Sequence, residues 1–311
     1  MSEPRKHHYI PVFYLKQWAG MDRQVCEYRL VQPGKIVTRR KFPNGTGYKH
    51  DLYRVDGVPD PIAQAVEREF MRMVDTQANY ALQKLIRGDS APWDSKERSS
   101  WTRFLLSLRF RNPETVLTIK RQMVDVWEAT LEDMKINYHK VRYVGDPPTF
   151  EEFVARTEAA APYKAALRLL QEIIDNPRVG PSIFGMRWSC ASLTASRISL
   201  LTSDRPLDMP HGLSDRGAYI ALPIGPKRLF IAAHDDAYAK RVASADPTEV
   251  VKAVNQAVVH QAREFVWGLD DSQRRFVSNR ISRVPDRPII TDVQKQQAID
   301  AALSVSPSTV C

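Results

Sequence analysis

The first sixty residues carry apolar side chains at a spacing of about two, which is typical of β-strands. Residues 24–30 and 35–40 hold Val, Ile, Tyr or Thr at this spacing, and they flank Pro33-Gly34. Two such runs separated by a Pro-Gly pair predict antiparallel strands joined by a turn. We therefore expect a β-hairpin near the N-terminus.

Between residues 60 and 175 the apolar positions recur every three or four residues, which predicts helices. The expected helices span about 60–88, 95–112, 113–138 and 149–175. Asp60-Pro61 is a typical helix start, Gly88 is a typical stop, and Asn112-Pro113 separates the second helix from the third. Residues 149–152 have the form of a capping box. The middle of the chain is thus expected to be a helical layer.

After residue 177 the chain returns to short β-rich runs broken by Gly, Pro and Asp. These runs cover 183–191, 198–202, 219–223 and 229–233. Asp246 then precedes a long helix with Val258 and Phe265 on its apolar side and Gly268 past its end. The order of strands, helices, strands and helix predicts an α+β protein.

Neither β segment has enough strands to bury a face alone, so we expect the N-terminal and C-terminal β segments to meet around the helical middle. This predicts a single composite domain over residues 1–303. It would consist of a β-rich segment (1–58), a helical layer (59–177), and a β segment with the long helix (178–303). Residues 304–311 are expected to be a frayed tail.

The composition is that of a globular protein, with 43% hydrophobic and 26% charged residues among 311. No apolar run approaches the roughly 18 residues that a membrane span needs, and the N-terminus lacks the apolar region of a signal peptide. Cys26, Cys190 and Cys311 lack the short spacings of a zinc cluster or redox motif. We therefore expect a soluble cytoplasmic protein with no membrane partner, and the oligomeric state stays open.

The net charge of +9 is concentrated near the N-terminus, where residues 1–60 hold 11 Lys and Arg against 6 Asp and Glu. The same segment carries eight of the 28 aromatic residues. Interleaved basic and aromatic side chains bind single strands by charge and stacking. This predicts a binding face, including Arg39, Arg40 and Lys41, for nucleic acid or another anionic ligand. The alternative is a small β-rich segment that packs its aromatic rings inward and leaves its charges in water.

Two short stretches contain the candidate chemistry. Residues 6–15 place His7 and His8 beside a proline and an aromatic cluster that includes Tyr14. Residues 200–206 end an apolar run in Thr-Ser-Asp, and Pro206 prevents the strand from continuing. Side chains at strand ends often carry function. Ser and Asp before a proline are also ordinary turn residues, and a histidine pair near a terminus is as often merely solvated or hydrogen-bonded.

Together these stretches resemble the bacterial family known as domain of unknown function 4238. The resemblance rests on His7-His8-Tyr9-Ile10-Pro11, Arg111-Asn112-Pro113 and Thr202-Ser203-Asp204-Arg205-Pro206, and it would span residues 6–268. The family pattern marks His8, Tyr9, Pro11, Tyr14, Leu15, Glu67, Arg111, Ser203, Asp204 and Pro206 in this sequence. Arg205 departs from it, since such proteins more often have Asn there. The resemblance implies no activity, so the reaction is left open.

His8 and Asp204, together with Ser203, are the candidate catalytic residues. A histidine with a carboxylate can act as an oriented general base, or the pair can hold a divalent metal that activates water. Arg111 suits a phosphate or carboxylate, and we expect it to converge with Glu67, His8 and Asp204 on one partly open cavity. A metal-assisted phosphodiester hydrolase is therefore one hypothesis, with the cofactor otherwise unknown.

The spacing His8-x-x-Pro11 also resembles the catalytic strand of His-Asn-His nucleases, with Asn44 and His50 as nominal partners. The gap between His8 and Asn44 is long for such a compact metal finger. Signatures of nucleotide triphosphatases, dehydrogenases, zincins and α/β-hydrolases are absent from the sequence. The favoured interpretation is a non-catalytic protein whose N-terminal face binds nucleic acid or a partner, with His8 and Asp204 in structural roles.

Overall fold

The structure, a computed structural model, describes residues 5–55, 63–88, 91–142, 145–157 and 159–281. The first of these ranges forms short strands and helical turns. They are β1 (Lys6–His8), α1 (Val12–Leu15), η1 (Lys16–Trp18), β2 (Val25–Gln32), β3 (Lys35–Lys41), η2 (Pro43–Gly45) and β4 (Tyr48–His50). The expected hairpin is confirmed as β2 and β3, and Gly34 accommodates the positive φ of 75° in its turn.

The middle of the chain is helical, as expected. It contains the π-helical turn η3 (Val66–Met71), α3 (Arg72–Arg87), α4 (Ser95–Phe110), α5 (Pro113–Val141), α6 (Phe150–Arg156), α7 (Ala161–Ile174) and α8 (Val179–Gly185). Gly88 ends α3 in a left-handed conformation, Asp94 and Glu97 form a capping box on α4, and Asn112 caps α5. The expected start at Asp60 lies outside the described residues. No helix in the described ranges is long and apolar enough to cross a membrane.

The single helix expected over 149–175 is wrong, because α6 and α7 divide that segment. Thr149 caps α6 as expected by accepting a hydrogen bond from the Glu152 N–H. The backbone of Thr157 is extended, which ends α6, and Pro162 lies in the first turn of α7. A proline is tolerated there because its missing N–H has no partner to lose. Inside one long helix it would remove a backbone hydrogen bond and clash with the preceding turn.

The C-terminal third returns to strands. Its elements are β5 (Arg187–Ser192), β6 (Thr202–Ser203), β7 (Tyr219–Gly225), β8 (Arg228–Ala233), α9 (Ala237–Ser244), α10 (Pro247–Gln261), β9 (Phe265–Gly268) and α11 (Arg274–Ser278). The strands expected at 219–223 and 229–233 are confirmed as β7 and β8. The strand expected at 183–191 is partly wrong, because α8 occupies its start. Asn176 begins α8 by accepting hydrogen bonds from the backbone N–H groups of Arg178 and Val179.

Two further expectations are corrected near β6 and β9. The strand expected at 198–202 is reduced to β6, because the side chain of Asn255 binds the preceding backbone. Its Oδ1 accepts from the Leu201 N–H at 2.8 Å, and its Nδ2 donates to the Ser199 carbonyl at 2.9 Å. The helix expected to include Phe265 ends at Gln261, and residues 265–268 form β9 instead.

A four-stranded sheet in the order β3-β2-β9-β6 joins the two ends of the chain. β2 pairs antiparallel with β9, with Cys26 opposite Gly268, and β9 pairs with β6. A Cβ atom at Gly268 would lie 2.8 Å from Cδ2 of Leu201, so glycine there permits close packing rather than ending a helix. The α+β class and the meeting of both β segments around a helical middle are therefore confirmed.

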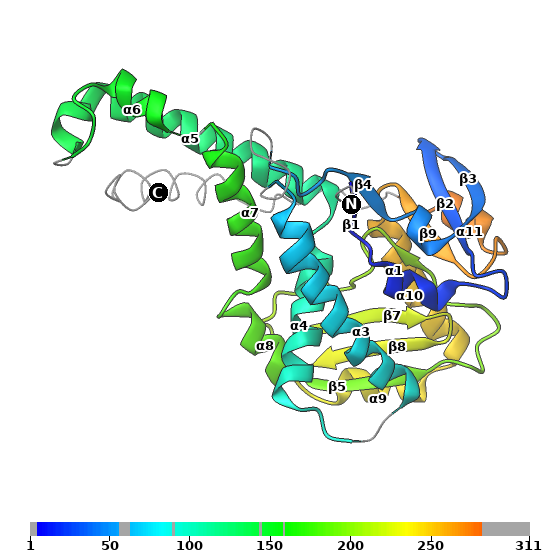
Figure 1. Ribbon diagram of the computed structural model, residues 1–311. Coiled ribbons are helices and arrows are strands. Elements are labelled where there is room, and N and C mark those ends of the chain that lie inside the picture. The colour runs from blue at the N-terminus through cyan, green and yellow to red at the C-terminus, as the bar shows by residue number, and fades with distance from the viewer. Residues whose placement is uncertain (1–4, 56–62, 89–90, 143–144, 158, 282–311) are drawn as a thin grey trace.

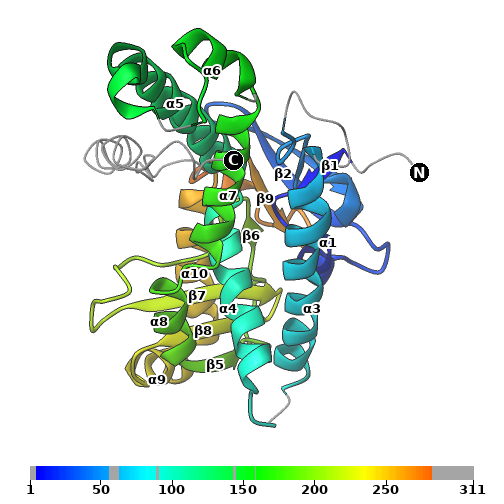
Figure 2. The same ribbon diagram turned by 60° about the vertical axis from the view of Figure 1, so that its left-hand side comes forward.

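A second sheet, β5-β8-β7, lies between α10 and the helical layer (Figures 1 and 2). Successive side chains alternate between its faces. Phe230 and Ala232 point to the side of α4, where the rings of Trp101 and Phe230 are 5.5 Å apart, whereas Leu229 and Ile231 belong to the cluster formed with α10. α5 and α6 extend away from this body in both views.

Candidate functional site

The two histidines of the N-terminal motif face opposite ways. β1 pairs antiparallel with β4, with His7 opposite Lys49 and His8 opposite Tyr48. His7 is fully buried, and its ring stacks on Tyr53 with centroids 5.4 Å apart. Its Nδ1 accepts a hydrogen bond of 2.9 Å from the Tyr53 N–H. His7, predicted as a binding residue, thus packs in the interior.

The Nε2 nitrogen of the His8 ring is buried without a hydrogen-bond partner among the described residues. Burial and the nearby Arg111 lower its pKa to about 4, although a hydrogen bond to the backbone of Asn44 opposes this shift. Nε2 is buried and has no hydrogen-bond partner among the described residues, so the donor to Asn44 is Nδ1. The ring is therefore neutral at pH 7, with an unprotonated Nε2. The lone pair on Nε2 would let this tautomer act as a general base or coordinate a metal.

His8 belongs to a set of four side chains on one face of the two-stranded β1–β4 sheet. Lys6, His8, Tyr48 and His50 share this face because opposite residues in an antiparallel pair point the same way. The Lys6 Nζ lies 4.8 Å from the ring centroid of Tyr48. The ring centroids of His8 and His50 lie 5.5 Å and 5.4 Å from that of Tyr48. We call these four residues the ribbon face.

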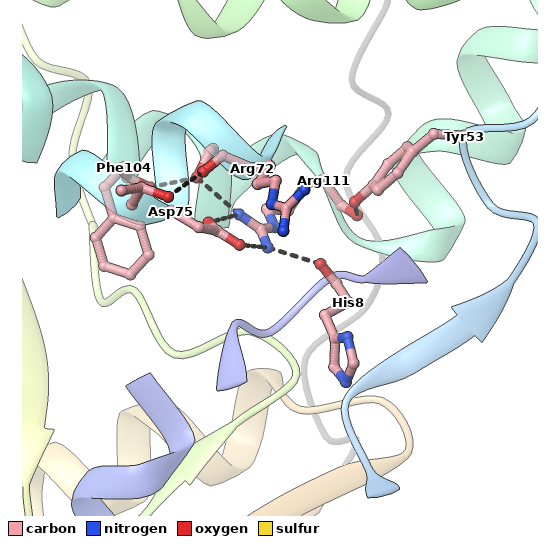
Figure 3. A network of polar contacts seen from close by, with 8 residues as sticks. His8, Tyr53, Arg72, Asp75, Phe104 and Arg111 are labelled. Atoms are coloured by element: carbon pink, nitrogen blue, oxygen red, sulfur yellow. Dashed lines mark hydrogen bonds and ion pairs between the residues drawn. The ribbon is translucent and has the colours of Figure 1, made fainter. Parts of the chain in front are cut away.

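Arg111 is fully buried at the centre of a polar network (Figure 3). Its Nη1 and Nη2 donate to the two carboxylate oxygens of Asp75 at 2.6 and 3.1 Å. Nη2 also donates to the carbonyl oxygen of His8 at 2.6 Å, and the Tyr53 hydroxyl donates to the Arg111 carbonyl at 3.0 Å. Arg111 therefore joins α3, α4 and β1, and its charge is already paired with a carboxylate.

Glu67 lies near this network, on the π-helical turn η3. Burial raises its pKa to about 7, against the opposite effect of Arg111. Within the described part of the chain, its Oε2 and the Oε1 of Gln64 are buried without hydrogen-bond partners. Glu67 therefore exchanges a proton near neutral pH. Single π-helical turns of this kind are frequent at functional sites.

Asp204, at the end of β6, binds backbone rather than facing a cavity. Its Oδ1 accepts from the Arg263 N–H at 2.9 Å, and its Oδ2 accepts from the N–H groups of Glu264 and Phe265 at 2.6 and 2.9 Å. Burial raises its pKa to about 6, although these three N–H groups lower it. The neighbouring Ser203 is buried and donates to the Val258 carbonyl at 3.0 Å. Both side chains thus fix the loop between α10 and β9.

His8 and Asp204 make different contacts. No hydrogen bond or ion pair joins them, and the described ranges contain no group of three His, Cys, Asp or Glu side chains placed to hold a metal. Tyr9 is the residue close to Asp204, since the pKa of Tyr9 is raised by burial and then by the Asp204 carboxylate. Arg111 contacts the His8 carbonyl and acts on Glu67, whereas Asp204 binds the backbone of residues 263–265.

Tyr14 connects the two sequence motifs. Its buried hydroxyl donates to the Pro223 carbonyl at 2.6 Å and lies 2.9 Å from the Oγ1 of Thr202. The nearby Trp18 Nε1 donates to the Leu200 carbonyl at 2.8 Å. The motif at residues 6–15 therefore packs directly on the motif at 200–206.

Both motifs lie within the segment that matches a family model described as "Protein of unknown function (DUF4238)", which covers residues 6–272. The chain belongs to this family. No curated protein and no solved structure matches it. The matched segment of this DUF4238 protein begins at β1 and ends just after β9, so it includes the whole four-stranded sheet β3-β2-β9-β6.

The basic run on β3 of this DUF4238 protein consists of Arg39, Arg40 and Lys41, and only one of these side chains is bound within the protein. Arg40 donates to both carboxylate oxygens of Asp22, at 3.0 and 2.6 Å, and to the Leu269 carbonyl at 2.6 Å. Arg39 and Lys41 form no ion pair with the described residues. Arg40 is therefore a structural residue, and Arg39 and Lys41 are available to a ligand.

The ribbon face itself is not expected from the sequence, which singles out His50 only as a nominal partner of the His-Asn-His motif. The signal is the spacing of two that relates Lys6 to His8 and Tyr48 to His50. Strands of three residues are too short for this alternation to be distinctive. Their pairing across forty residues is visible only in the structure.

Proposed function

We propose that this DUF4238 protein binds single-stranded nucleic acid on the ribbon face and the adjacent β2–β3 hairpin. The observation that carries this proposal is the contact of Lys6, His8 and His50 with Tyr48, whose ring lies at the centre of the ribbon face. The rings of His8 and His50 are tilted and edge-on to that of Tyr48, and a cation beside such aromatic side chains can hold a phosphate while a ring meets a base.

Further cations extend this surface. Lys35, Arg39 and Lys41 on β3 make no ion pair within the described part of the chain. Phe42, which follows Lys41, is 54% exposed. The ribbon and the hairpin lie near one another in both views of the fold (Figures 1 and 2). Unpaired cations gain most from a phosphate backbone, because they release its counterions without first breaking an internal ion pair.

Three features favour binding over hydrolysis. Both oxygens of Asp204 already accept backbone N–H groups, and Arg111 is already paired with Asp75. His8, the third candidate, forms no hydrogen bond or ion pair with Asp204. A metal-assisted hydrolase needs an open set of ligands around its ion, and the described residues contain no such set. Cleavage is therefore the rival outcome in the experiment below.

The experiment is fluorescence anisotropy with labelled single-stranded DNA, single-stranded RNA and duplex DNA, each in EDTA and in Mg²⁺. We expect single strands to bind more tightly than duplex, and we expect binding in EDTA because no metal is required; Mg²⁺ should weaken it only by competing for the phosphates. Tyr48→Ala should weaken single-strand binding by about tenfold or more, because the stacking surface is removed. Tyr80→Ala is the matched control, because Tyr80 is 73% exposed on α3, away from the ribbon face.

Two results would overturn the proposal. One is the absence of binding at low salt, and the other is an equal loss of affinity in Tyr48→Ala and Tyr80→Ala. Shortening of the labelled strand in Mg²⁺ and its preservation in EDTA would support the hydrolase instead.

A further inference from the structure

We propose that the outer edge of β5 binds an extended acidic segment of a partner protein as an added strand. β5 forms one edge of the sheet β5-β8-β7, on the side away from β7 (Figure 1). The ribbon face is formed by β1 and β4, which belong to a different sheet. The proposal therefore does not depend on nucleic-acid binding.

Alternate residues of β5 direct their backbone groups out of the sheet. In an antiparallel pair, residues that exchange hydrogen bonds alternate with residues whose N–H and C=O groups point away. The Leu193 N–H donates to the Lys227 carbonyl at 2.8 Å and continues the register of β5 with β8. This alternation makes the N–H and C=O groups of Trp188, Cys190 and Ser192 point away from β8. They have no hydrogen-bond partner within the described ranges, and Trp188 and Cys190 are only half-buried, while Ser192 is exposed.

Two other sheet edges are protected against such pairing. On β7, Ala221 exchanges two hydrogen bonds of 2.9 Å with Asp208, and Pro223 has no N–H and accepts from Tyr14. β3 carries four basic residues, which oppose pairing with another strand. β5 has six residues with no proline and no lysine, and it pairs with β8 without a bulge. An edge strand of this kind accepts a further strand through its main-chain groups.

Two arginines near the ends of β5 indicate an acidic partner. The Cζ of Arg98 lies 4.1 Å from the ring centroid of Trp188, and its Nη2 donates to the Met186 carbonyl just before β5 begins. Arg228 on β8 is opposite Ser192, the last residue of β5. Neither arginine forms an ion pair with a carboxylate in the described part of the chain. A carboxylate on the added strand gains a charge-assisted contact there without displacing an internal partner.

The two arginines define a spacing on the partner. Trp188 and Ser192 are four residues apart, so their side chains share the face of the sheet toward α4, where Trp188 and Cys190 pack. Residues of the added strand opposite these two positions also lie on that face. Carboxylates at these positions reach Arg98 and Arg228. The residue between them is opposite the small Cys190 side chain, where an apolar residue packs.

A second copy of the chain fits this edge less well. It carries the same two arginines and the same net charge of +9. Like charges oppose association, whereas an acidic segment is attracted. The expected partner is therefore an extended acidic peptide of a different protein.

The test measures fluorescence polarisation of the labelled peptide Thr-Glu-Val-Val-Val-Glu-Thr with the full chain. We expect a dissociation constant in the micromolar range that rises with salt. The peptide Thr-Gln-Val-Val-Val-Gln-Thr should bind about tenfold more weakly. Arg228→Gln should weaken the acidic peptide by about fivefold and leave the Gln peptide unchanged. Arg216→Gln is the matched control, because Arg216 is an exposed cation that precedes β7 at the other edge.

Ser192→Pro removes an outward N–H and keeps the hydrogen bonds to β8, because proline is tolerated at such positions of edge strands. It should weaken the peptide by about tenfold at an unchanged melting temperature, whereas Ser192→Thr, which keeps the N–H, should bind normally. Tyr48→Ala should also bind the peptide normally, which separates this edge from the ribbon face. Unchanged affinity in Ser192→Pro, or no binding at millimolar peptide, would overturn the strand addition. Equal binding of the two peptides, or unchanged affinity in Arg228→Gln, would overturn the acidic partner.

Discussion

The hydroxyl of Tyr14 lies 2.9 Å from the hydroxyl of Thr202, 188 residues later in the chain. The same Tyr14 oxygen donates to the Pro223 carbonyl, so one side chain binds β6 and β7 to the N-terminal motif. Tyr14 was predicted to bind a ligand, but its full burial gives it this structural position. The two family motifs are thus parts of one packed interface.

Tyr14→Phe is expected to destabilise the fold by about 1–3 kcal/mol, because the ring stays and two buried polar groups lose a partner. Urea unfolding at pH 7.5 measures this loss. Tyr80→Phe, at an exposed tyrosine, should change the free energy of unfolding little. Equal stabilities of Tyr14→Phe and the wild type would contradict the structural role.

The Arg111–Asp75 pair should respond unequally to removal of either partner. Asp75→Ala leaves Arg111, whose side chain is 0% exposed, without its carboxylate, and we expect a loss of about 3–5 kcal/mol. Arg111→Met leaves Asp75, whose side chain is 25% exposed and can be hydrated, so the loss should be smaller. Urea unfolding measures the loss of unfolding free energy in each variant. A larger loss in Arg111→Met than in Asp75→Ala would contradict this prediction.

The basic run on β3 should separate into binding and structural residues. Arg39→Gln with Lys41→Gln, which avoids placing a carboxylate opposite Glu27, should weaken single-strand binding and reduce the salt slope by about one for each phosphate that is no longer neutralised. The melting temperature should stay unchanged, because neither side chain has an ion-pair partner among the described residues. Arg40→Glu should instead lower the melting temperature, because it can no longer bind Asp22 and the Leu269 carbonyl. Unchanged affinity in the double variant would place the nucleic-acid surface elsewhere.

The sequence predicts the sheet that joins the chain ends, but not the strand that completes it. Phe265 follows Val258 by seven residues and so continues the helical spacing of α10. Its backbone becomes β9 because β2 and β6 lie on either side of it, and both come from distant parts of the chain. Spacing along the chain cannot show these neighbours, which is why a helix was expected to continue there.

The contacts of the candidate site residues also depend on neighbours that are distant in the sequence. Sequence reasoning selected Arg111 and Asp204 as polar residues with rigid backbone around them. The partner of each is decided by packing: Asp75 reaches Arg111 from α3, and the N–H groups of residues 263–265 reach Asp204 after α10. Whether a polar residue faces a ligand or a protein group depends on such neighbours, which leave no local pattern in the sequence.

Glu67 should make stability depend on pH. Its folded-state pKa of about 7 lies above its ordinary value of 4.5, so the folded state binds the proton more tightly. The stabilisation that protonated Glu67 gives the folded state is fully present below pH 4.5 and is lost as pH rises through 7. His8, with its pKa lowered to about 4, acts in the opposite direction below its ordinary value of 6.5.

Glu67→Gln isolates the effect of the carboxyl group. Between pH 5 and 8 the wild type should lose about 2–3 kcal/mol more than this variant, measured by urea unfolding across the range. Asp215→Asn serves as a control at an exposed carboxylate. Parallel curves for the wild type and Glu67→Gln would show that Glu67 ionises at the same pH in the folded and unfolded states.

Asp204→Asn keeps the shape of the side chain but replaces one acceptor oxygen with an NH₂ group. Asp204 accepts three backbone N–H groups through its two oxygens, so either orientation of the amide leaves at least one of them facing another donor. We expect a loss on the order of 3 kcal/mol at pH 7.5, where the carboxyl is ionised, against little change in Asp215→Asn. Single-strand affinity of the folded variant should be unchanged, because both Asp204 oxygens are occupied by backbone N–H groups and Asp204 is not part of the ribbon face. A stable Asp204→Asn protein that no longer binds or cleaves a single strand would instead assign Asp204 to the ligand, as the hydrolase hypothesis requires.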